Sequence, residues 1–62
     1  MCEANVYILN KDGQTSLLLD AVDKVIPMEA DRIYLENIYG ERKTVKARIK
    51  EMHLVDHRII LE

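Results

Sequence analysis

Short stretches in which residues alternate in polarity cover most of the chain and predict β-strands. The first runs from Ala4 to Leu9, where β-forming residues occupy both alternating faces. Asp12-Gly13 follows, a dipeptide typical of hairpin turns because glycine adopts positive φ without a steric penalty. We therefore expect a hairpin that leads into a second strand around residues 14–19.

The stretch from Leu17 to Glu29 fits two structures. Its apolar residues at helical spacing are Leu18, Ala21, Val22, Val25 and Ile26. Pro27 argues against a helix that continues past Ile26, because proline lacks an amide hydrogen and clashes with the preceding turn. The same residues fit a strand from Val22 to Met28, with Pro27 at a sheet edge, and we favour the strand.

The second half of the chain alternates more regularly. Two strands are expected on either side of a turn at Gly40-Glu41, over Arg32–Ile38 and Thr44–Ile49. In the later strand the residues expected to face inward are Val45, Ala47 and Ile49, and those expected to face outward are Lys46, Arg48 and Lys50. A turn at Asp56-His57 leads to a last strand over residues 59–61.

These short strands and tight turns predict an all-β fold. We expect a small barrel or sandwich of about five to seven antiparallel strands, in one domain over residues 1–62. A chain of this size buries only about 60% of the surface that it exposes when unfolded, so its core is small. Edge strands with apolar residues on both faces favour pairing with a second copy, and we expect a homodimer.

Composition narrows the class of protein. The single cysteine excludes an intramolecular disulfide, and the sequence shows neither a secretory leader nor a membrane-spanning stretch, so we expect a cytoplasmic protein without membrane contact. The net charge of −2 gives no general attraction for nucleic acid. We expect no enzymatic activity, because the sequence has no glycine-rich phosphate loop and no Ser, His and Asp arrangement that so small a domain could assemble.

The only cysteine, Cys2, carries the most distinctive chemistry. Aminopeptidases favour removal of Met1 before a small residue, which would leave an α-amine and a thiol on one residue. These groups and the ionised backbone amide of Glu3 form adjacent chelate rings, a tetragonal arrangement of nitrogen and sulfur that suits Ni(II) or Cu(II). If Met1 stays, only the thiolate remains, and a lone cysteine equally fits a small buried hydrophobic residue.

Several patterns resemble the CooT family. They are Met1-Cys2, a strand ending in Lys11-Asp12-Gly13, the segment Asp20-Ala21-Val22-Asp23-Lys24-Val25, and Ala47-x-Ile49 followed by Leu54-x-x-x-Arg58-Ile59-Ile60-Leu61. Members are small nickel-binding accessory proteins linked to maturation of carbon monoxide dehydrogenase, and relatives are often described as RNA-binding. The resemblance implies a β-rich homodimer in which Cys2 ligates nickel, with carbon monoxide dehydrogenase or its maturation proteins as partners.

A dimer would complete such a metal site. Two amino termini at a two-fold axis would supply two thiolates and two nitrogens, a square plane around Ni(II). Glu3 is the second candidate ligand, through its amide nitrogen or as a weaker axial carboxylate, although a solvated charge at the chain end is the simpler interpretation. His53 and His57 are weaker candidates, because they need not converge in a strand-and-turn pattern. Together with Cys2, the resemblance implies a metallochaperone-like accessory protein that binds Ni(II).

A run of basic residues supports an alternative, RNA binding by a small β protein. Five basic residues fall within a short segment, namely Arg42, Lys43, Lys46, Arg48 and Lys50. A basic strand beside Tyr39 could contact a phosphate backbone. Glu41 and Glu51 bracket the run, however, and a solvated strand face that protects a sheet edge is the plainer explanation.

Overall fold

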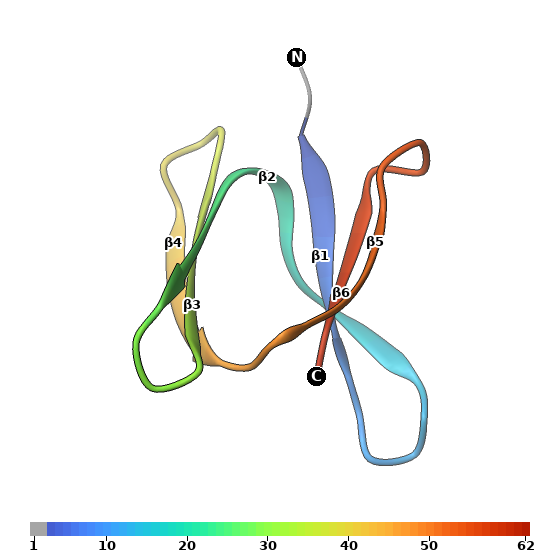
Figure 1. Ribbon diagram of the computed structural model, residues 1–62. Coiled ribbons are helices and arrows are strands. Elements are labelled where there is room, and N and C mark those ends of the chain that lie inside the picture. Colours follow the sequence, from blue (N-terminus) through green and yellow to red (C-terminus); the bar gives the residue numbers. More distant parts are fainter. Residues whose placement is uncertain (1–2) are drawn as a thin grey trace.

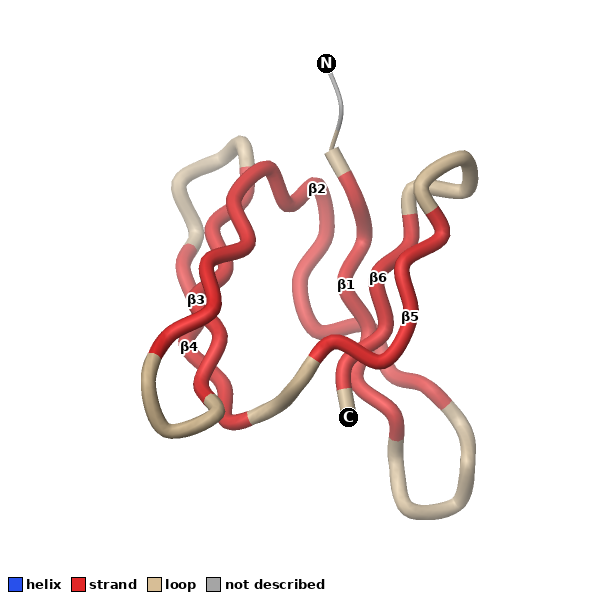
Figure 2. The backbone as a smooth tube through the Cα atoms, viewed as in Figure 1, coloured by secondary structure: helices blue, strands red, loops and turns tan. Residues whose placement is uncertain are grey.

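The computed structural model describes residues 3–62, and within that range the chain forms six strands and no helix (Figures 1 and 2). The strands are β1 (Ala4–Leu9), β2 (Thr15–Met28), β3 (Arg32–Asn37), β4 (Arg42–Lys46), β5 (Ile49–His53) and β6 (Arg58–Leu61). The predicted all-β class is confirmed, and the stretch that also fitted a helix belongs to β2. Met1 and Cys2 lie outside the described residues, so the Cys2 prediction is not addressed by the fold.

A single six-stranded sheet contains these strands, in the order β4-β3-β2-β1-β6-β5. The expectation of a barrel or sandwich is wrong in this respect, because β4 and β5 are the two edges of the sheet and do not pair with each other in the part of the chain described. Antiparallel pairing throughout is also wrong, since β1 and β6 run parallel from Asn5↔Arg58 to Ile8↔Leu61. Alternating polarity predicts that a segment is a strand. It does not identify the neighbouring strand in the sheet when the two strands are far apart in the sequence.

The sheet folds over because β2 changes partner along its length (Figure 1). Its first half pairs with β1 and its second half with β3, and irregular pairing near Ala21 marks β-bulges at the change. Ala21 has a φ of 52°, and its amide donates to Asn5 Oδ1 at 3.2 Å while its carbonyl accepts from Ile38 N at 3.0 Å. These contacts hold the bend that brings the two ends of the sheet toward each other.

The core lies between the two arms that this bend creates, β3–β4 on one side and β1–β6–β5 on the other (Figure 2). Its buried residues are Val6, Leu19, Val22, Ile33, Leu35, Ala47, Ile59 and Leu61. The predicted turns at Gly13 and Gly40 are confirmed, with φ values of 86° and 83° that suit glycine. Among residues 3–62 no helix is long and apolar enough to cross a membrane.

The single strand expected over Thr44–Ile49 is wrong. β4 ends at Lys46, and Ala47 and Arg48 form a link that crosses from one edge of the sheet to the other. Ala47 is buried and its amide donates to Asp31 O at 2.9 Å, while Arg48 and Glu62 exchange backbone hydrogen bonds at 3.0 and 2.9 Å. The alternation continues through this link, so the pattern alone hides the break.

Candidate functional site

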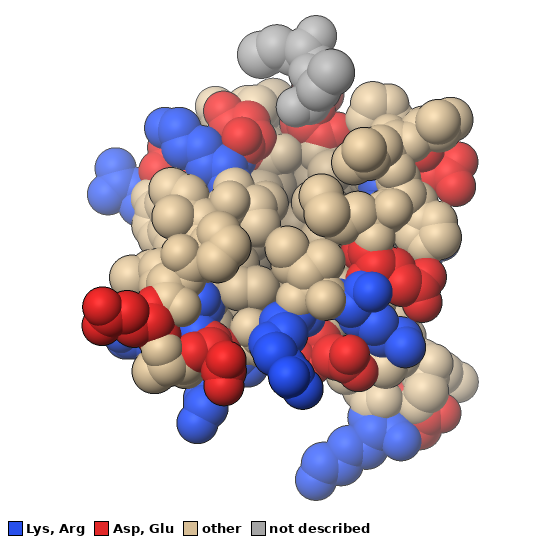
Figure 3. Space-filling view, viewed as in Figure 1, with Lys and Arg blue, Asp and Glu red and all other residues tan. Residues whose placement is uncertain are grey.

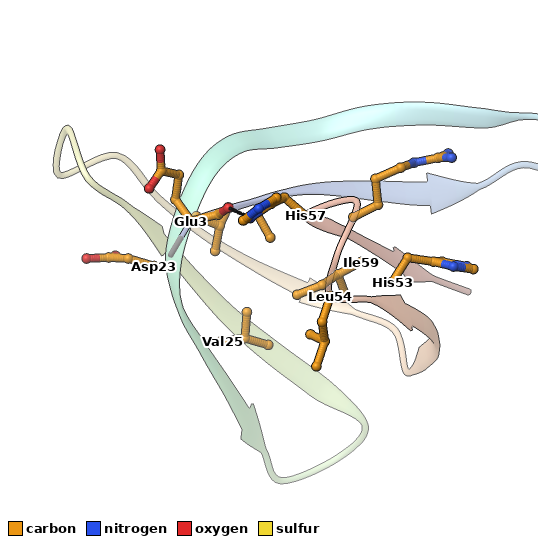
Figure 4. A pocket seen from close by; sticks show the side chains of 10 residues that line it. Glu3, Asp23, Val25, His53, Leu54, His57 and Ile59 are labelled. Carbon is orange, nitrogen blue, oxygen red and sulfur yellow. Dashed lines mark hydrogen bonds between the residues drawn. The ribbon is translucent and has the colours of Figure 1, made fainter. Parts of the chain in front are cut away.

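A hollow of about 420 Å³ lies beside the start of β1 (Figure 4). Residues from the start of β1, the bend of β2 and the β5–β6 turn line this amino-terminal hollow: Glu3, Ala4, Val22, Asp23, Val25, His53, Leu54, His57, Arg58 and Ile59. Aliphatic side chains form most of its wall, and the carboxylates of Glu3 and Asp23 point away from Val25 and Leu54 (Figure 4). The hollow therefore combines an apolar floor with acidic groups at its rim.

Glu3, a predicted ligand, directly follows Cys2 and is half-buried. Its Oε2 is buried and has no hydrogen-bond partner within residues 3–62. Ligation by the Glu3 carboxylate stays a prediction, as does the simpler interpretation of a solvated charge at the chain end. A buried carboxylate oxygen without a partner is costly, and a cation would offset that cost.

The backbone around Glu3 is held by His57. The Nδ1 of His57 lies 3.0 Å from the carbonyl oxygen of Glu3, and because a carbonyl only accepts, Nδ1 carries the proton and donates it. The carbonyl oxygen of His57 accepts a hydrogen bond from Asn5 N at 2.8 Å. These two contacts, one on either side of Ala4, fix the start of β1 against the β5–β6 turn.

The two histidines line the same hollow but face different groups. Figure 4 shows the ring of His57 beside Glu3 and the ring of His53 directed away from it. His53 Nε2 lies 2.7 Å from Glu51 Oε1, and this hydrogen bond lowers the pKa of the Glu51 carboxyl. Residues 3–62 contain no group of three or more His, Asp or Glu side chains placed to hold a metal ion together.

A second hollow, of about 400 Å³, adjoins Glu3. Asp20 and Ala21 from the bend of β2 line it, together with Glu3, Asn5 and His57. Asp23 lines the first hollow and Asp20 lines the second, while Glu3 lines both. Both aspartates are on β2, so carboxylates from this strand and from Glu3 gather beside the start of β1, and their negative charge attracts cations.

The basic residues proposed for RNA binding do not share one strand face. Arg42, Lys43 and Lys46 lie on β4, Arg48 lies in the link, and Lys50 lies on β5 at the opposite edge of the sheet. Lys43 stands opposite the buried Leu35, and its Nζ donates to Leu18 O at 2.9 Å. The prediction of one continuous basic strand face is therefore wrong.

A different basic face forms on the opposite side of β2, β3 and β4 from Leu35. The strand register places its residues in three rows: Lys24, Glu36 and Arg42; Ile26, Tyr34 and Thr44; and Met28, Arg32 and Lys46. We call these residues the basic face, because they include four cations and one carboxylate. Sequence reasoning missed it since Lys24 and Arg32 are distant from the basic run, and only the pairing register unites them.

Neighbouring side chains compensate the negative charge of Glu36, the one carboxylate of the basic face. The hydroxyl of Tyr34 donates to Glu36 Oε1, while Lys24 Nζ lies 3.3 Å from Oε2 and Arg42 Nε lies 3.6 Å from Oε1. The hydrogen bond from Tyr34, followed by that from Lys24, lowers the pKa of Glu36, and the same Tyr34–Glu36 bond raises the pKa of Tyr34. Glu36 therefore stays ionised, and two of the four cations are committed to it.

Comparison with known proteins identifies the family. The sequence model of a family described as "CO dehydrogenase accessory protein CooT" matches residues 1–62. This chain belongs to the CooT family. The family resemblance predicted from the sequence is confirmed, and with it the description as an accessory protein of CO dehydrogenase.

A solved structure supports the same assignment. A crystal structure assigned to CooT from Carboxydothermus hydrogenoformans is similar to this chain, with a TM-score of 0.87 and 53% sequence identity over 97% of this chain and 94% of that chain. Comparison with curated proteins gave no match. The curled all-β sheet described above is thus similar to that of a solved protein assigned to the same family.

Proposed function

We propose that this CooT-family protein is a nickel-binding accessory protein that carries Ni(II) as cargo for carbon monoxide dehydrogenase, with Cys2 as the principal ligand. Family membership supports the accessory role. The observation that carries the metal proposal is Glu3, whose buried Oε2 has no partner among the described residues and which directly follows the only cysteine. A thiolate and a carboxylate on consecutive residues are a donor set that fits a divalent cation.

The chain's own groups each have a defined part in this proposal. Cys2 supplies a thiolate and, once Met1 is removed, an α-amine, and Glu3 supplies its amide nitrogen with the carboxylate as a weaker ligand. A bound cation lowers the pKa of a thiol, because the thiolate is the ligand. His57 fixes the carbonyl of Glu3 at 3.0 Å, so a ligand set that includes Glu3 starts from an anchored backbone. Asp20 and Asp23 add negative charge that draws cations to this end of the molecule.

The proposal includes a homodimer. Exposed apolar side chains gather at the β5–β6 turn beside the amino-terminal hollow, where Leu54 is 71% and Val55 92% exposed. Figure 3 shows uncharged surface across the middle of one side of the molecule, with charged side chains around it. Apolar surface of this kind favours association, and a second copy would bring a second Cys2 to complete a square plane around nickel.

A cytoplasmic, non-catalytic role in nickel handover completes the proposal. Ligands near a chain end can exchange an ion without unfolding the domain. The alternative, RNA binding, depended on a single basic strand face. The residues of that run are divided between two edges of the sheet and a link, so we do not favour it.

Transfer of nickel tests this proposal. Nickel-free carbon monoxide dehydrogenase is incubated with nickel-loaded protein, and recovery of carbon monoxide oxidation is measured alongside nickel bound after dialysis. We expect Cys2→Ser to lose nickel binding and to restore no activity, while its unfolding transition matches that of the wild type. Cys2→Ser that still retains and delivers nickel would refute the role of the thiol.

A matched variant separates the two predicted ligands. Glu3→Gln keeps the amide nitrogen and the size of the side chain but removes the charge. We expect it to bind nickel more weakly than the wild type and more tightly than Cys2→Ser, because the carboxylate is the weaker donor for a soft N,S site. Nickel affinity equal to that of the wild type would remove the Glu3 carboxylate from the ligand set.

A further inference from the structure

The basic face has two ends that differ in how their charges are compensated. At the end formed by Lys24, Glu36 and Arg42, both cations lie within 3.6 Å of a carboxylate oxygen. At the other end Arg32 stands directly opposite Lys46 on the neighbouring strand, and neither forms an ion pair with another of residues 3–62. Like charges directly opposite each other in a sheet repel and lower stability. This end therefore attracts negative charge from outside the chain.

Exposed aliphatic surface lies next to the uncompensated cations. Met28 is directly opposite Arg32 on the side away from Lys46, and it is 45% exposed. Ile26 occupies the middle row beside Tyr34 and is 49% exposed. The unpaired end of the face thus presents two cations and two large apolar side chains on adjacent strands, a combination that binds carboxylates and aliphatic side chains together.

The same face is poorly suited to nucleic acid. Only two of its cations are free of a carboxylate, and phosphate binding by so few charges is weak at physiological salt. Tyr34, the aromatic residue of the face, is half-buried and its hydroxyl is bound to Glu36, so it offers no free ring on which a base could stack.

We propose that the unpaired end of the basic face, formed by Arg32, Lys46, Met28 and Ile26, is a docking surface for an acidic, aliphatic segment of a partner protein. Carboxylates of the segment lie between Arg32 and Lys46 and relieve their repulsion. Its aliphatic side chains cover Met28 and Ile26. The surface is on β2, β3 and β4 and does not involve the amino-terminal hollow, so a partner held there leaves the start of β1 accessible. The inference does not depend on nickel binding.

The test is an NMR titration of the full chain with a short synthetic peptide in which Asp or Glu alternates with Leu. We expect shifts concentrated on the amides of Met28, Arg32 and Lys46. The double variant Arg32→Glu with Lys46→Glu should raise the Kd of the peptide about tenfold or more, because it removes both cations that contact the acidic side chains. A tenfold change in Kd corresponds to about 1.4 kcal/mol. A peptide with Asn and Gln in place of the acids should give no shifts at these amides.

The control is Lys11→Glu with Lys50→Glu, which changes the net charge equally at two exposed residues outside the face. It should bind the acidic peptide within twofold of the wild type. Equal weakening by both double variants would reduce the effect to net charge and overturn the proposal, as would shifts that map away from β3 and β4. Tighter binding of a single-stranded oligouridylate than of the acidic peptide at the same amides would overturn it in favour of RNA.

Discussion

The amino-terminal hollow and the basic face are built on the same sheet but by different means. The hollow brings together the start of β1, the bend of β2 and the β5–β6 turn, and its geometry depends on a parallel pair and on one imidazole that holds a backbone carbonyl. The basic face is a regular array on three neighbouring antiparallel strands. One region thus depends on long-range assembly of the chain ends, and the other on local register.

The two regions also carry opposite charges. Glu3, Asp20 and Asp23 surround the start of β1 and favour a cation, whereas Arg32 and Lys46 favour an acidic partner. The proposed cargo site and the proposed docking surface would therefore lie on separate parts of one short chain. The variants below test whether the two regions act independently.

Leu54→Asp is expected to have the largest effect, on the region of the hollow. It places a charge where the proposed dimer buries an apolar side chain, and it should weaken self-association about a hundredfold. Sedimentation equilibrium measures the change. Leu17→Asp is the control, because Leu17 is exposed on β2 and does not line the amino-terminal hollow, so this variant should leave the dimer intact. Dimers of Leu54→Asp as tight as those of the wild type would place the interface elsewhere.

His57→Ala should lower the free energy of unfolding by about 2 kcal/mol. It removes the hydrogen bond to the Glu3 carbonyl, which contributes about 1 kcal/mol, and places alanine at a φ of 55° that alanine disfavours. His57→Asn loses the ring but tolerates this backbone, so it should cost about half as much. Urea denaturation measures both variants. If neither variant is less stable than the wild type, His57 does not hold the start of β1.

Lys46→Glu tests the uncompensated end of the basic face. It puts a carboxylate opposite Arg32 in place of a like charge, and it should raise the free energy of unfolding by about 0.5 kcal/mol at low salt. The gain should shrink in high salt, because exposed charges are screened. Lys50→Glu is the matched control, because Lys50 on β5 has no cation opposite it on β6. A loss of stability in Lys46→Glu would contradict the repulsion between Arg32 and Lys46.

Glu36→Gln is expected to give the smallest effect, visible as a pH dependence at the paired end of the basic face. The pKa of Glu36 is lowered in the folded protein, chiefly by the hydrogen bond from Tyr34. Its contribution to stability is therefore fully present above its ordinary pKa of 4.5 and is lost as the pH falls through the lower folded pKa. The stability of the wild type should fall toward that of Glu36→Gln in this range, as followed by urea denaturation. A constant difference between them across this range would contradict the assignment.

The sequence predicts the local elements well and their assembly poorly. Alternation and the glycines at positions 13 and 40 identify the strands and turns, including a strand through Pro27. Pairing between β1 and β6 accompanies burial of Val6, Ile59 and Leu61 in one core, which no local pattern encodes. The break at Ala47 is hidden because a buried alanine in the link keeps the alternation that a strand would show.

The candidate site shows the same division. Cys2 and Glu3 are predicted as ligands from their chemistry and position in the chain, and the fold adds that Glu3 is half-buried, with an Oε2 that has no partner among residues 3–62. His57 was seen only as a weak ligand candidate, because its contact with Glu3 joins residues 54 positions apart. The run of basic residues from Arg42 to Lys50 led to the wrong prediction of one basic strand face. These residues are close in the sequence, but the fold divides them between opposite edges of the sheet.

The most direct test of the central proposal is a Ni(II) titration followed by ultraviolet and visible absorption, on protein whose amino terminus has been established by mass spectrometry. We predict a thiolate-to-nickel charge-transfer band that saturates at a fixed ratio of metal to subunit and is lost in Cys2→Ser. No such band on protein from which Met1 has been removed, or a band that persists in Cys2→Ser, would contradict nickel binding through Cys2.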